Sequence, residues 1–397
     1  MRPVEEALAA ILEAVGPLAP IELPLLEAHG CVLATEIVAE YDVPPFSAAG
    51  ADGFAARSAD ISAPPATLRV TGAAPAGRPP ELTVGWGEAV AVPAGAPLPA
   101  GADCVIPRDA SELEGDRLHL AESLEAGAFV LPAGRDLRAG EVLVPAGRRL
   151  AAPELAVLAS AGHAAPATYP KVRVAVLSVG ELVEPGRPAA LGQVRDAGSF
   201  AVVGALRDLG AVPYRVGILP ADAAELREAV LTNLARADAF VVTAGSSDED
   251  LSADLFGGLG IDLTEVAMYP GMVHGFGLFE GTPFFVLSGA PASTFVSFEV
   301  LVRPAMLRMM GRRDPGRPEV EALADEEVSG PSELTLFVPA RVGKREGEWH
   351  VTPMGPADPS LLHGLARANG LIVIPPGDRA TAAGERVSVR IFRPLDR

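Results

Sequence analysis

The middle of the chain is organised around the stretch Lys171-Val-Arg-Val-Ala-Val-Leu-Ser-Val-Gly180, in which residues 172–177 form an unbroken strand-like run. Apolar strands are predicted at 212–219 and 239–242, and helices at 199–209 and 222–235. Such strands alternating with helices are typical of a parallel sheet covered on both faces. We therefore predict a doubly wound α/β domain over residues 171–311, with ligands bound at the carboxyl ends of its strands.

The flanking regions differ in pattern. Residues 3–15 place Val4, Leu8, Ile11, Leu12 and Val15 on one side of a helix. Short β-type segments then dominate: 31–37, 89–93, 104–107 and 141–145. A short helix is predicted at 153–161 and a long apolar helix at 291–310. After a proline-rich linker at 311–318, further strand-like segments predict a small β-barrel or sandwich.

Composition excludes several classes of protein. The 397 residues include 51 Asp and Glu against 32 Lys and Arg, a net charge of −19, which disfavours binding to nucleic acid or to an acidic membrane surface. Cys31 and Cys104 lie in apolar stretches and are interpreted as buried hydrophobic residues rather than a disulfide or metal site. No run is long and apolar enough to span a membrane, and the start of the sequence lacks the apolar core of a signal peptide. We expect a soluble, cytoplasmic protein.

Four dispersed motifs carry a resemblance to a known family. Residues 42–57 (Asp-Val-Pro-Pro-Phe-Ser-Ala-Ala-Gly-Ala-Asp-Gly-Phe-Ala-Ala-Arg) are similar to D-V-P-x-F-D-N-S-A-M-D-G-[YF]-A-x-R, and residues 94–106 to T-G-A-P-x-P-x-G-A-D-A-V-[VI]. Residues 133–140 resemble G-x-D-[IV]-x-x-G, and residues 368–375 resemble A-N-[GC]-[LI]-x-x-[LI]-P. These motifs are those of the molybdopterin molybdotransferase family, the MoeA type that includes the C-terminal domain of gephyrin.

The resemblance implies a domain organisation and a reaction. It implies an elongated dimerisation region (1–40 plus 138–170), a β-rich lobe (41–137), an α/β molybdopterin-binding domain (171–311) and a C-terminal β-barrel (318–397). The implied function is molybdenum cofactor biosynthesis. A molybdopterin adenylyltransferase would be the partner that supplies adenylylated molybdopterin, and this chain would hydrolyse it with Mg²⁺ while inserting molybdate. The family's site lies between two subunits, so a homodimer is expected.

The resemblance also implies site residues. Asp52, Asp136 and Glu181 fall on acidic positions of the family motifs and are the candidate catalytic residues. A solvated turn or cap carboxylate is the alternative for each. The candidate substrate-binding residues lie at turns after strands of the α/β domain or in the lysine-rich motif of the family: Gly245, Ser246, Ser247, Gly271, Ser288, Gly289 and Pro291. The metal ligands are left open.

The anion-binding side departs from the family pattern. Tyr269 and Met272 replace both lysines of K-P-G-K-P-F-x-F-G, and acidic residues 248–250 follow Ser247 where the family has a phosphate-binding glycine loop. Like charges near 4 Å cost about 4 kcal/mol at an effective dielectric of 20. His274 or Arg195 would restore some positive charge, although a lone histidine is more often a core or surface residue. The alternative function is therefore a catalytically degenerate paralogue that binds molybdopterin or serves as a scaffold.

Overall fold

The computed structural model describes residues 1–244, 252–356, 358, 362–377 and 380–393. The chain divides into two compact units. One unit comprises Met1–Leu23, Gly30–Ala34 and Ala167–Arg397, and the other comprises Pro24–His29 and Thr35–Pro166. The four domain boundaries implied by the family resemblance stay a prediction. Among the described residues, no helix combines the length and the apolar character needed to cross a bilayer.

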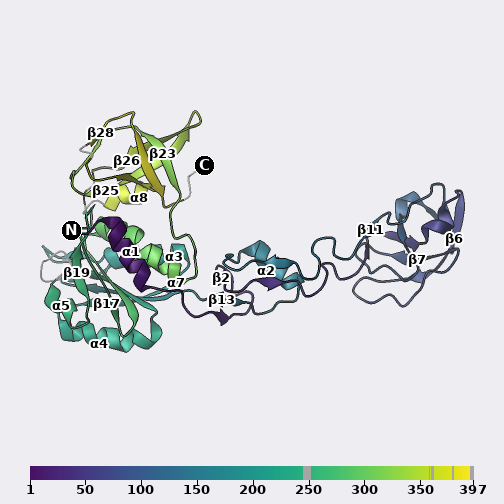
Figure 1. Ribbon diagram of the computed structural model, residues 1–397, viewed down its shortest axis with the longest axis horizontal. Coiled ribbons are helices and arrows are strands. Elements are labelled where there is room, and N and C mark those ends of the chain that lie inside the picture. The colour runs from purple at the N-terminus through teal and green to yellow at the C-terminus, as the bar shows by residue number, and fades with distance from the viewer. Residues whose placement is uncertain (245–251, 357, 359–361, 378–379, 394–397) are drawn as a thin grey trace. The chain divides into compact units, whose positions relative to one another are not determined.

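The larger unit contains the predicted α/β domain, built on a six-stranded sheet (Figure 1). The strands run in the order β17 (Val212–Leu219), β14 (Arg173–Val179), β18 (Ala239–Ala244), β22 (Thr282–Leu287), β21 (Val273–Phe279) and β19 (Asp262–Glu265). The three predicted strands, β17, β14 and β18, are parallel as expected, and β22 is parallel to them. The last two strands add an antiparallel edge that the sequence analysis did not anticipate. The β21–β22 hairpin turns at Glu280 and Gly281, whose φ angles of 49° and 78° suit a two-residue hairpin loop.

Both faces of the sheet are covered, which explains the continuous apolar strands. Val174 and Val176 of β14 belong to a buried cluster with α1 (Val4–Ala14) and α3 (Gly198–Leu209). The alternate residues of β14, Ala175 and Leu177, belong to a second cluster with α4 (Ala223–Asn233) and α5 (Ala253–Gly257). Because successive side chains of a strand point to opposite faces, every residue of β14 beyond the first is buried.

The boundaries of the helices follow local chemistry. Gly210, with a φ of 92°, ends α3 in the left-handed conformation that glycine adopts without strain. Asp222 caps α4, because its Oδ1 accepts hydrogen bonds from the N–H groups of Ala224 and Glu225, both at 2.9 Å. The long apolar helix is continuous but contains a π-helical turn (Phe298–Val302) between α6 (Pro291–Ser297) and α7 (Arg303–Met309). Pro304 lacks an N–H to donate, which accounts for this local change of hydrogen bonding.

The C-terminal part of the larger unit is a closed β-barrel, one of the two predicted possibilities. Its strands pair in the order β25 (Thr335–Arg345), β26 (Glu348–Pro353), β23 (Glu319–Ala324), β29 (Arg386–Ile391) and β27 (Gly370–Ile374), and β27 closes the ring on β25. Helix α8 (Leu362–Arg367) precedes β27, and β20 (Met268–Tyr269) joins the outside of the ring by parallel pairing with β25. The unit also contains small sheets. Strand β24 (Val328–Ser329) pairs with β28 (Ala380–Thr381), β15 (Leu182–Val183) pairs with β16 (Val194–Arg195), and β13 (Ala167–Tyr169) lies between β1 (Ile21–Glu22) and β2 (Val32–Leu33).

The smaller unit is β-rich, as predicted. Its main sheet has the order β8 (Cys104–Pro107), β5 (Gly53–Ala56), β7 (Glu88–Val92), β6 (Ala66–Ala73), β10 (Arg117–Leu120) and β9 (Glu112–Glu114). Two smaller pairs are β4 (Ala48–Ala49) with β11 (Val130–Leu131), and β3 (Ile37–Val38) with β12 (Val142–Val144), and α2 (Ala152–Ser160) is the predicted short helix. The prediction of a single strand at 31–37 is wrong. Two short strands take its place, and β2 pairs in the larger unit whereas β3 pairs in the smaller one.

Both cysteines are buried, as the sequence analysis expects. Burial raises the pKa of the Cys104 thiol to about 12, and the neighbouring Asp103 carboxylate adds to this shift. A thiol with such a high pKa is almost fully protonated near neutral pH and is a poor nucleophile. Cys104 is therefore a core residue of the smaller unit.

Candidate functional site

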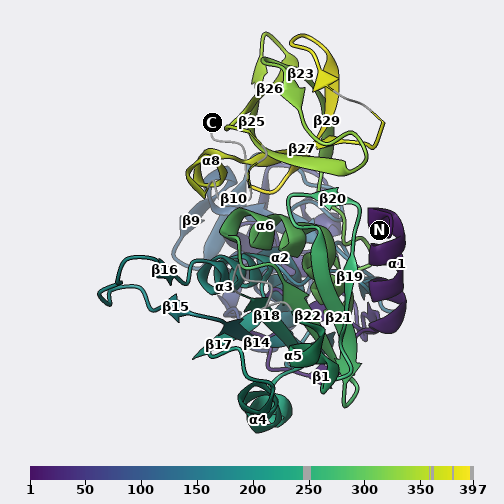
Figure 2. The same ribbon diagram turned by 90° about the vertical axis from the view of Figure 1, so that its left-hand side faces the viewer.

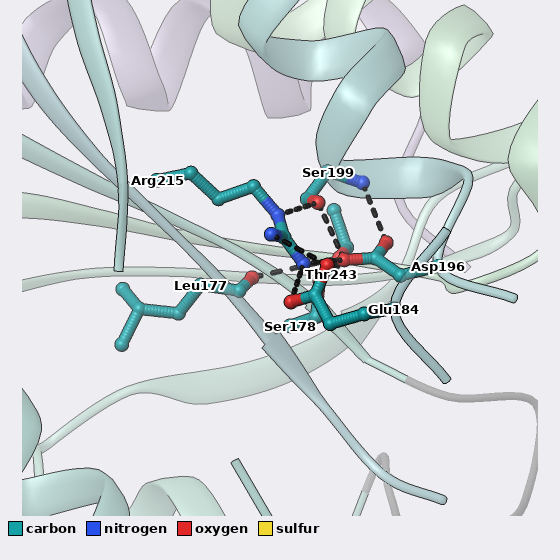
Figure 3. Close-up of polar contacts among 7 residues, drawn as sticks. All are labelled: Leu177, Ser178, Glu184, Asp196, Ser199, Arg215 and Thr243. Carbon is teal, nitrogen blue, oxygen red and sulfur yellow. Dashed lines mark hydrogen bonds and ion pairs between the residues drawn. The ribbon is translucent and has the colours of Figure 1, made fainter. Parts of the chain in front are cut away.

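A buried polar network lies at the carboxyl ends of the parallel strands (Figure 3). Ser178 of β14 and Thr243 of β18 are directly opposite each other in the sheet, and their hydroxyl oxygens are 3.0 Å apart. The Ser178 hydroxyl donates a hydrogen bond to Asp196 Oδ2 at 2.7 Å. These groups occupy the edge of the sheet where open α/β domains bind their ligands.

Asp196 is the centre of this network. Only 2% of its surface is exposed, and its carboxylate accepts hydrogen bonds from Ser178, from the N–H and hydroxyl of Ser199, and from Arg215 Nη2 at 2.8 Å. Burial by itself would raise the pKa of Asp196, but the hydrogen bonds from Ser199, Ser178 and Arg215 bring it below its usual value. Asp196 is therefore an ionised carboxylate whose acceptor positions are already used.

Arg215 comes from the edge strand β17 and supplies the positive charge of the network. Its Nη1 and Nη2 form a two-pronged ion pair with Glu184 at 3.0 and 2.7 Å, and its Nε donates to the Ser199 hydroxyl at 2.7 Å. The guanidinium also lies 4.7 Å from the centre of the Phe200 ring. Burial would lower the pKa of Arg215, but the bonds to Glu184 and Asp196 raise it above its usual value.

Sequence reasoning missed Arg215 and Glu184 as members of this network. The available signal was a single arginine inside the otherwise apolar strand 212–219. Such a residue must pair with a carboxylate when it is partly buried. The sequence alone does not say which carboxylate, because Glu184 and Asp196 lie 31 and 19 positions away.

The predicted residues of the α/β domain do not join this network. Glu181 is exposed in the turn after β14 and follows Gly180, which has a φ of 121° and donates its N–H to the Leu219 carbonyl at 3.0 Å. Ser288, Gly289 and Pro291 form the half-buried turn that leads from β22 into α6. In that turn the Thr294 hydroxyl hydrogen-bonds to the Ser288 carbonyl.

Gly271 closes the turn between β20 and β21. Its φ is 90°, and a Cβ at this position would lie 2.4 Å from the Ser297 hydroxyl oxygen of α6. The chain therefore requires glycine here for two reasons, its backbone conformation and its close approach to the helix. The other predicted residues of the anion-binding side, Gly245, Ser246 and Ser247, lie outside the described residues, as does the acidic run 248–250.

The two predicted acids of the smaller unit are both exposed. Asp52 precedes β5, and its Oδ1 accepts a hydrogen bond from the Ala94 N–H at 2.7 Å, linking the first two family motifs. Asp136 lies in the loop after β11, where its N–H donates to the Val43 carbonyl at 3.0 Å. Both carboxylates are accessible to a ligand, and their catalytic roles stay a prediction.

His274 does not restore the positive charge of the family's lysines. His274 is only 4% exposed, and neither ring nitrogen makes a hydrogen bond with any described residue. Burial lowers the pKa of His274 to about 4, although the nearby Gly271 backbone opposes this shift, so the ring is neutral near pH 7. It is a core residue. Arg195 is exposed, and its guanidinium donates to the Arg187 carbonyl at 3.4 Å.

The described residues do not form a complete divalent-cation site. No group of three or more His, Cys, Asp or Glu side chains among them is arranged to hold a metal ion. Asp196, the most buried carboxylate at the strand ends, already accepts hydrogen bonds from Arg215 and two serines. The described side chains by themselves therefore do not account for a bound metal ion.

Family models cover most of the sequence. The model for the MoeA N-terminal region (domain I and II) matches residues 2–162, and the model for a probable molybdopterin binding domain matches residues 175–308. The model for the MoeA C-terminal region (domain IV) matches residues 321–392. The matches occur in the order that the sequence motifs imply.

Relatives and solved structures match nearly the whole chain. Molybdopterin molybdenumtransferase 2 of Mycobacterium tuberculosis is 33% identical over 403 residues, covering 98% of this chain and 99% of the relative. Molybdopterin molybdenumtransferase 1 of the same organism is 34% identical and covers 98% of each chain. The crystal structure of the molybdopterin biosynthesis MoeA protein from Pyrococcus horikoshii superimposes with a TM-score of 0.84 at 30% identity, covering 99% of each chain. The chain belongs to the MoeA family of molybdopterin molybdenumtransferases.

Proposed function

We propose that this chain is a molybdopterin molybdenumtransferase, an enzyme of molybdenum cofactor biosynthesis that inserts molybdate into adenylylated molybdopterin. The observation that carries the proposal is the match, at 33% identity, to a relative of that name over almost the full length of both chains. A degenerate scaffold is not favoured, because the similarity extends through all three family models.

The proposed site uses exposed acids together with turns at the strand ends. Asp52, Asp136 and Glu181 are the catalytic carboxylates, which would orient water and the reacting phosphate. Their exposure supports this role, since a ligand can reach each of them. The turns that contain Gly271 and residues 288–291 would bind the pterin phosphate through backbone N–H groups. Residues 245–247, which lie outside the described residues, are proposed to bind the same phosphate.

We further propose an oligomeric state, a location, a partner and a metal ion for the enzyme. The enzyme is a homodimer in the cytoplasm, and a molybdopterin adenylyltransferase supplies its substrate. Mg²⁺ usually binds through one or two carboxylates plus substrate phosphates. A magnesium requirement would therefore depend on the bound substrate as well as on protein side chains. Comparing activity in magnesium with activity in EDTA tests this requirement.

The transferase activity can be measured directly. Purified protein is incubated with adenylylated molybdopterin, molybdate and magnesium, and both AMP release and molybdenum-loaded pterin are followed. We expect both products, and we expect Asp52→Asn to reduce them at least about tenfold, a typical effect of losing a group that acts in the transition state. The control is an active transferase assayed in parallel. If that control is active while this chain forms neither product, the proposed function is wrong.

A further inference from the structure

The Arg215 guanidinium contacts both ends of the segment 184–196, which lies beside the proposed site. The segment 184–196 begins after β15 (Leu182–Val183), outside the six-stranded sheet, and returns through β16 (Val194–Arg195), which pairs with β15 (Figure 2). Glu184 begins this segment and Asp196 ends it. Arg215 Nη2 contacts both carboxylates, Glu184 at 2.7 Å and Asp196 at 2.8 Å (Figure 3).

Among the described residues, no other cation is seen to pair with the carboxylates of Asp196 and Glu184. The Asp196 side chain is 1% exposed and the Glu184 side chain 42% exposed, so one carboxylate depends on the protein for its counter-charge and the other is partly solvated. Arg195, also at the base of the segment, contacts a backbone carbonyl instead. Removing one partner of a buried ion pair leaves an uncompensated charge, which is strongly unfavourable.

We call the contacts of Arg215 with Glu184 and Asp196 the clamp. It lies next to the candidate catalytic residue Glu181 in the chain. Glu181 precedes β15 directly, and the Asp196 N–H donates to the Val183 carbonyl at 3.0 Å. The same Asp196 carboxylate is tied to Ser178 of β14 and Ser199 of α3. The turn that carries Glu181 therefore has one side fixed to the sheet and the other side fixed through Arg215.

We propose that Arg215 is a positioning residue of the transferase site, which sets the turn carrying Glu181 by holding Glu184 and Asp196 together. This inference rests on the proposed function. Arg215 does not touch substrate in this role. Its effect is exerted through the base of the segment 184–196, and the fork of a guanidinium is required because two carboxylates must be bound at once.

A matched control exists in the same sheet. Arg173, at the other end of β14, forms a two-pronged ion pair with Asp238 at 3.0 and 2.7 Å. Replacing Arg173 removes the same kind of interaction from the same domain, away from the strand ends that carry Glu181. The variants are therefore Arg215→Met, Arg215→Lys and Arg173→Met in the full-length protein.

Two independent readouts test the clamp. Hydrogen exchange of peptides covering residues 182–197 should rise at least about fivefold in Arg215→Met and stay unchanged in Arg173→Met. In the transferase assay, Arg215→Met should lower kcat roughly 10- to 100-fold with a smaller change in KM, since small misplacements of catalytic groups cost rates of this order. Arg215→Lys should recover part of kcat, and Arg173→Met should stay within about twofold of wild type.

The outcomes separate the two proposals. Equal kcat values for Arg215→Met and Arg173→Met, or unchanged exchange at 182–197 in Arg215→Met, would overturn the positioning role. An inactive wild-type protein would refute the proposed function, and with it the catalytic part of this inference, while the exchange measurement would still decide whether the clamp exists. If Arg215→Met does not fold, Glu184→Gln replaces it, because that variant weakens the clamp on its partly solvated side and should raise exchange and lower kcat in the same direction.

Discussion

At the scale of single residues, burial decides what a titratable side chain can do. His274 occupies a position in the family's lysine-rich motif, yet its ring faces a core cluster and a small cavity of about 160 Å³ lined by Ile11, Phe276 and Phe285. Leaving buried polar groups without partners costs about 1–3 kcal/mol. The histidine is therefore a cost to stability rather than a source of positive charge.

Replacing this histidine tests that conclusion. His274→Phe should increase the free energy of unfolding at pH 7 by roughly 1–2 kcal/mol, because it removes two ring nitrogens that have no hydrogen-bond partner among the described residues. The adjacent cavity gives the larger ring room to adjust. The exposed His29 is the control, since His29→Phe should change stability much less. Urea unfolding measures both variants, and a destabilised His274→Phe would contradict the prediction.

The same side chain predicts a pH dependence with a definite sign. The folded pKa of His274 is about 4, below its ordinary value of 6.5, so the unfolded chain binds a proton more readily between these two values. Because that protonation favours the unfolded chain, the free energy of unfolding decreases as the pH falls from 6.5 toward 4. Between pH 7 and pH 5 wild type should lose about 2 kcal/mol through this group, and His274→Phe should lack that component. Equal pH profiles for the two proteins would argue against it.

At the scale of elements, the close approach of two backbones explains why a motif position must be glycine. Gly53 follows the candidate acid Asp52 in a family motif, and the structure gives it a physical reason. A Cβ on Gly53 would lie 1.9 Å from the Ile106 carbonyl oxygen, across the pairing of β5 with β8. The glycine permits the sheet to form beside Asp52.

A pair of glycine substitutions tests this reason. Gly53→Ala should destabilise the protein by roughly 1–3 kcal/mol, because the backbone of β8 must move away. Gly204→Ala should stabilise it by about 0.5–1 kcal/mol, since a Cβ on Gly204 inside α3 would meet no atom within 4 Å and alanine favours the helix. Thermal and denaturant unfolding report both changes. A neutral Gly53→Ala would show that β5 and β8 are not constrained as described.

At the scale of the whole molecule, the proposed homodimer predicts what happens when two inactive variants are mixed. Asp52 and Glu181 belong to different compact units of one chain. If each site takes Asp52 from one subunit and Glu181 from the other, a heterodimer of Asp52→Ala and Glu181→Gln carries one intact site and one doubly altered site. Co-refolding equal amounts of the two inactive variants should then restore about a quarter of wild-type activity by random pairing.

Controls make the mixing experiment decisive. Each variant refolded alone should stay inactive, and a mixture of Asp52→Ala with Asp136→Asn should not recover, because both substitutions alter the same unit. Sedimentation measurements should give the mass of two chains for every mixture. Absence of recovery in fully dimeric samples would exclude a site shared in this way.

The sequence by itself determined the elements and their order. Continuous apolar strands, helix periodicity and glycine stops are local signals, and they correctly predicted β14, α3, β17, α4 and β18. Near the C-terminus the same signals left a barrel and a sandwich open, and the structure has the barrel. Local signals failed where a strand is determined by its pairing with a distant part of the chain. The segment at 31–37 divides between two units, and the β21–β19 edge depends on a hairpin turn that apolar periodicity does not reveal.

Only the tertiary structure decided which charges meet. Arg215 is the single arginine of an otherwise apolar strand, yet nothing in the local sequence links it to Asp196 or to Glu184. Their contact exists because β17 lies beside β14 in the sheet, where Arg215 is opposite Val176 and its guanidinium reaches Asp196 and Glu184. Secondary structure arises from neighbours along the chain, whereas a buried ion pair is fixed by the order of strands in space.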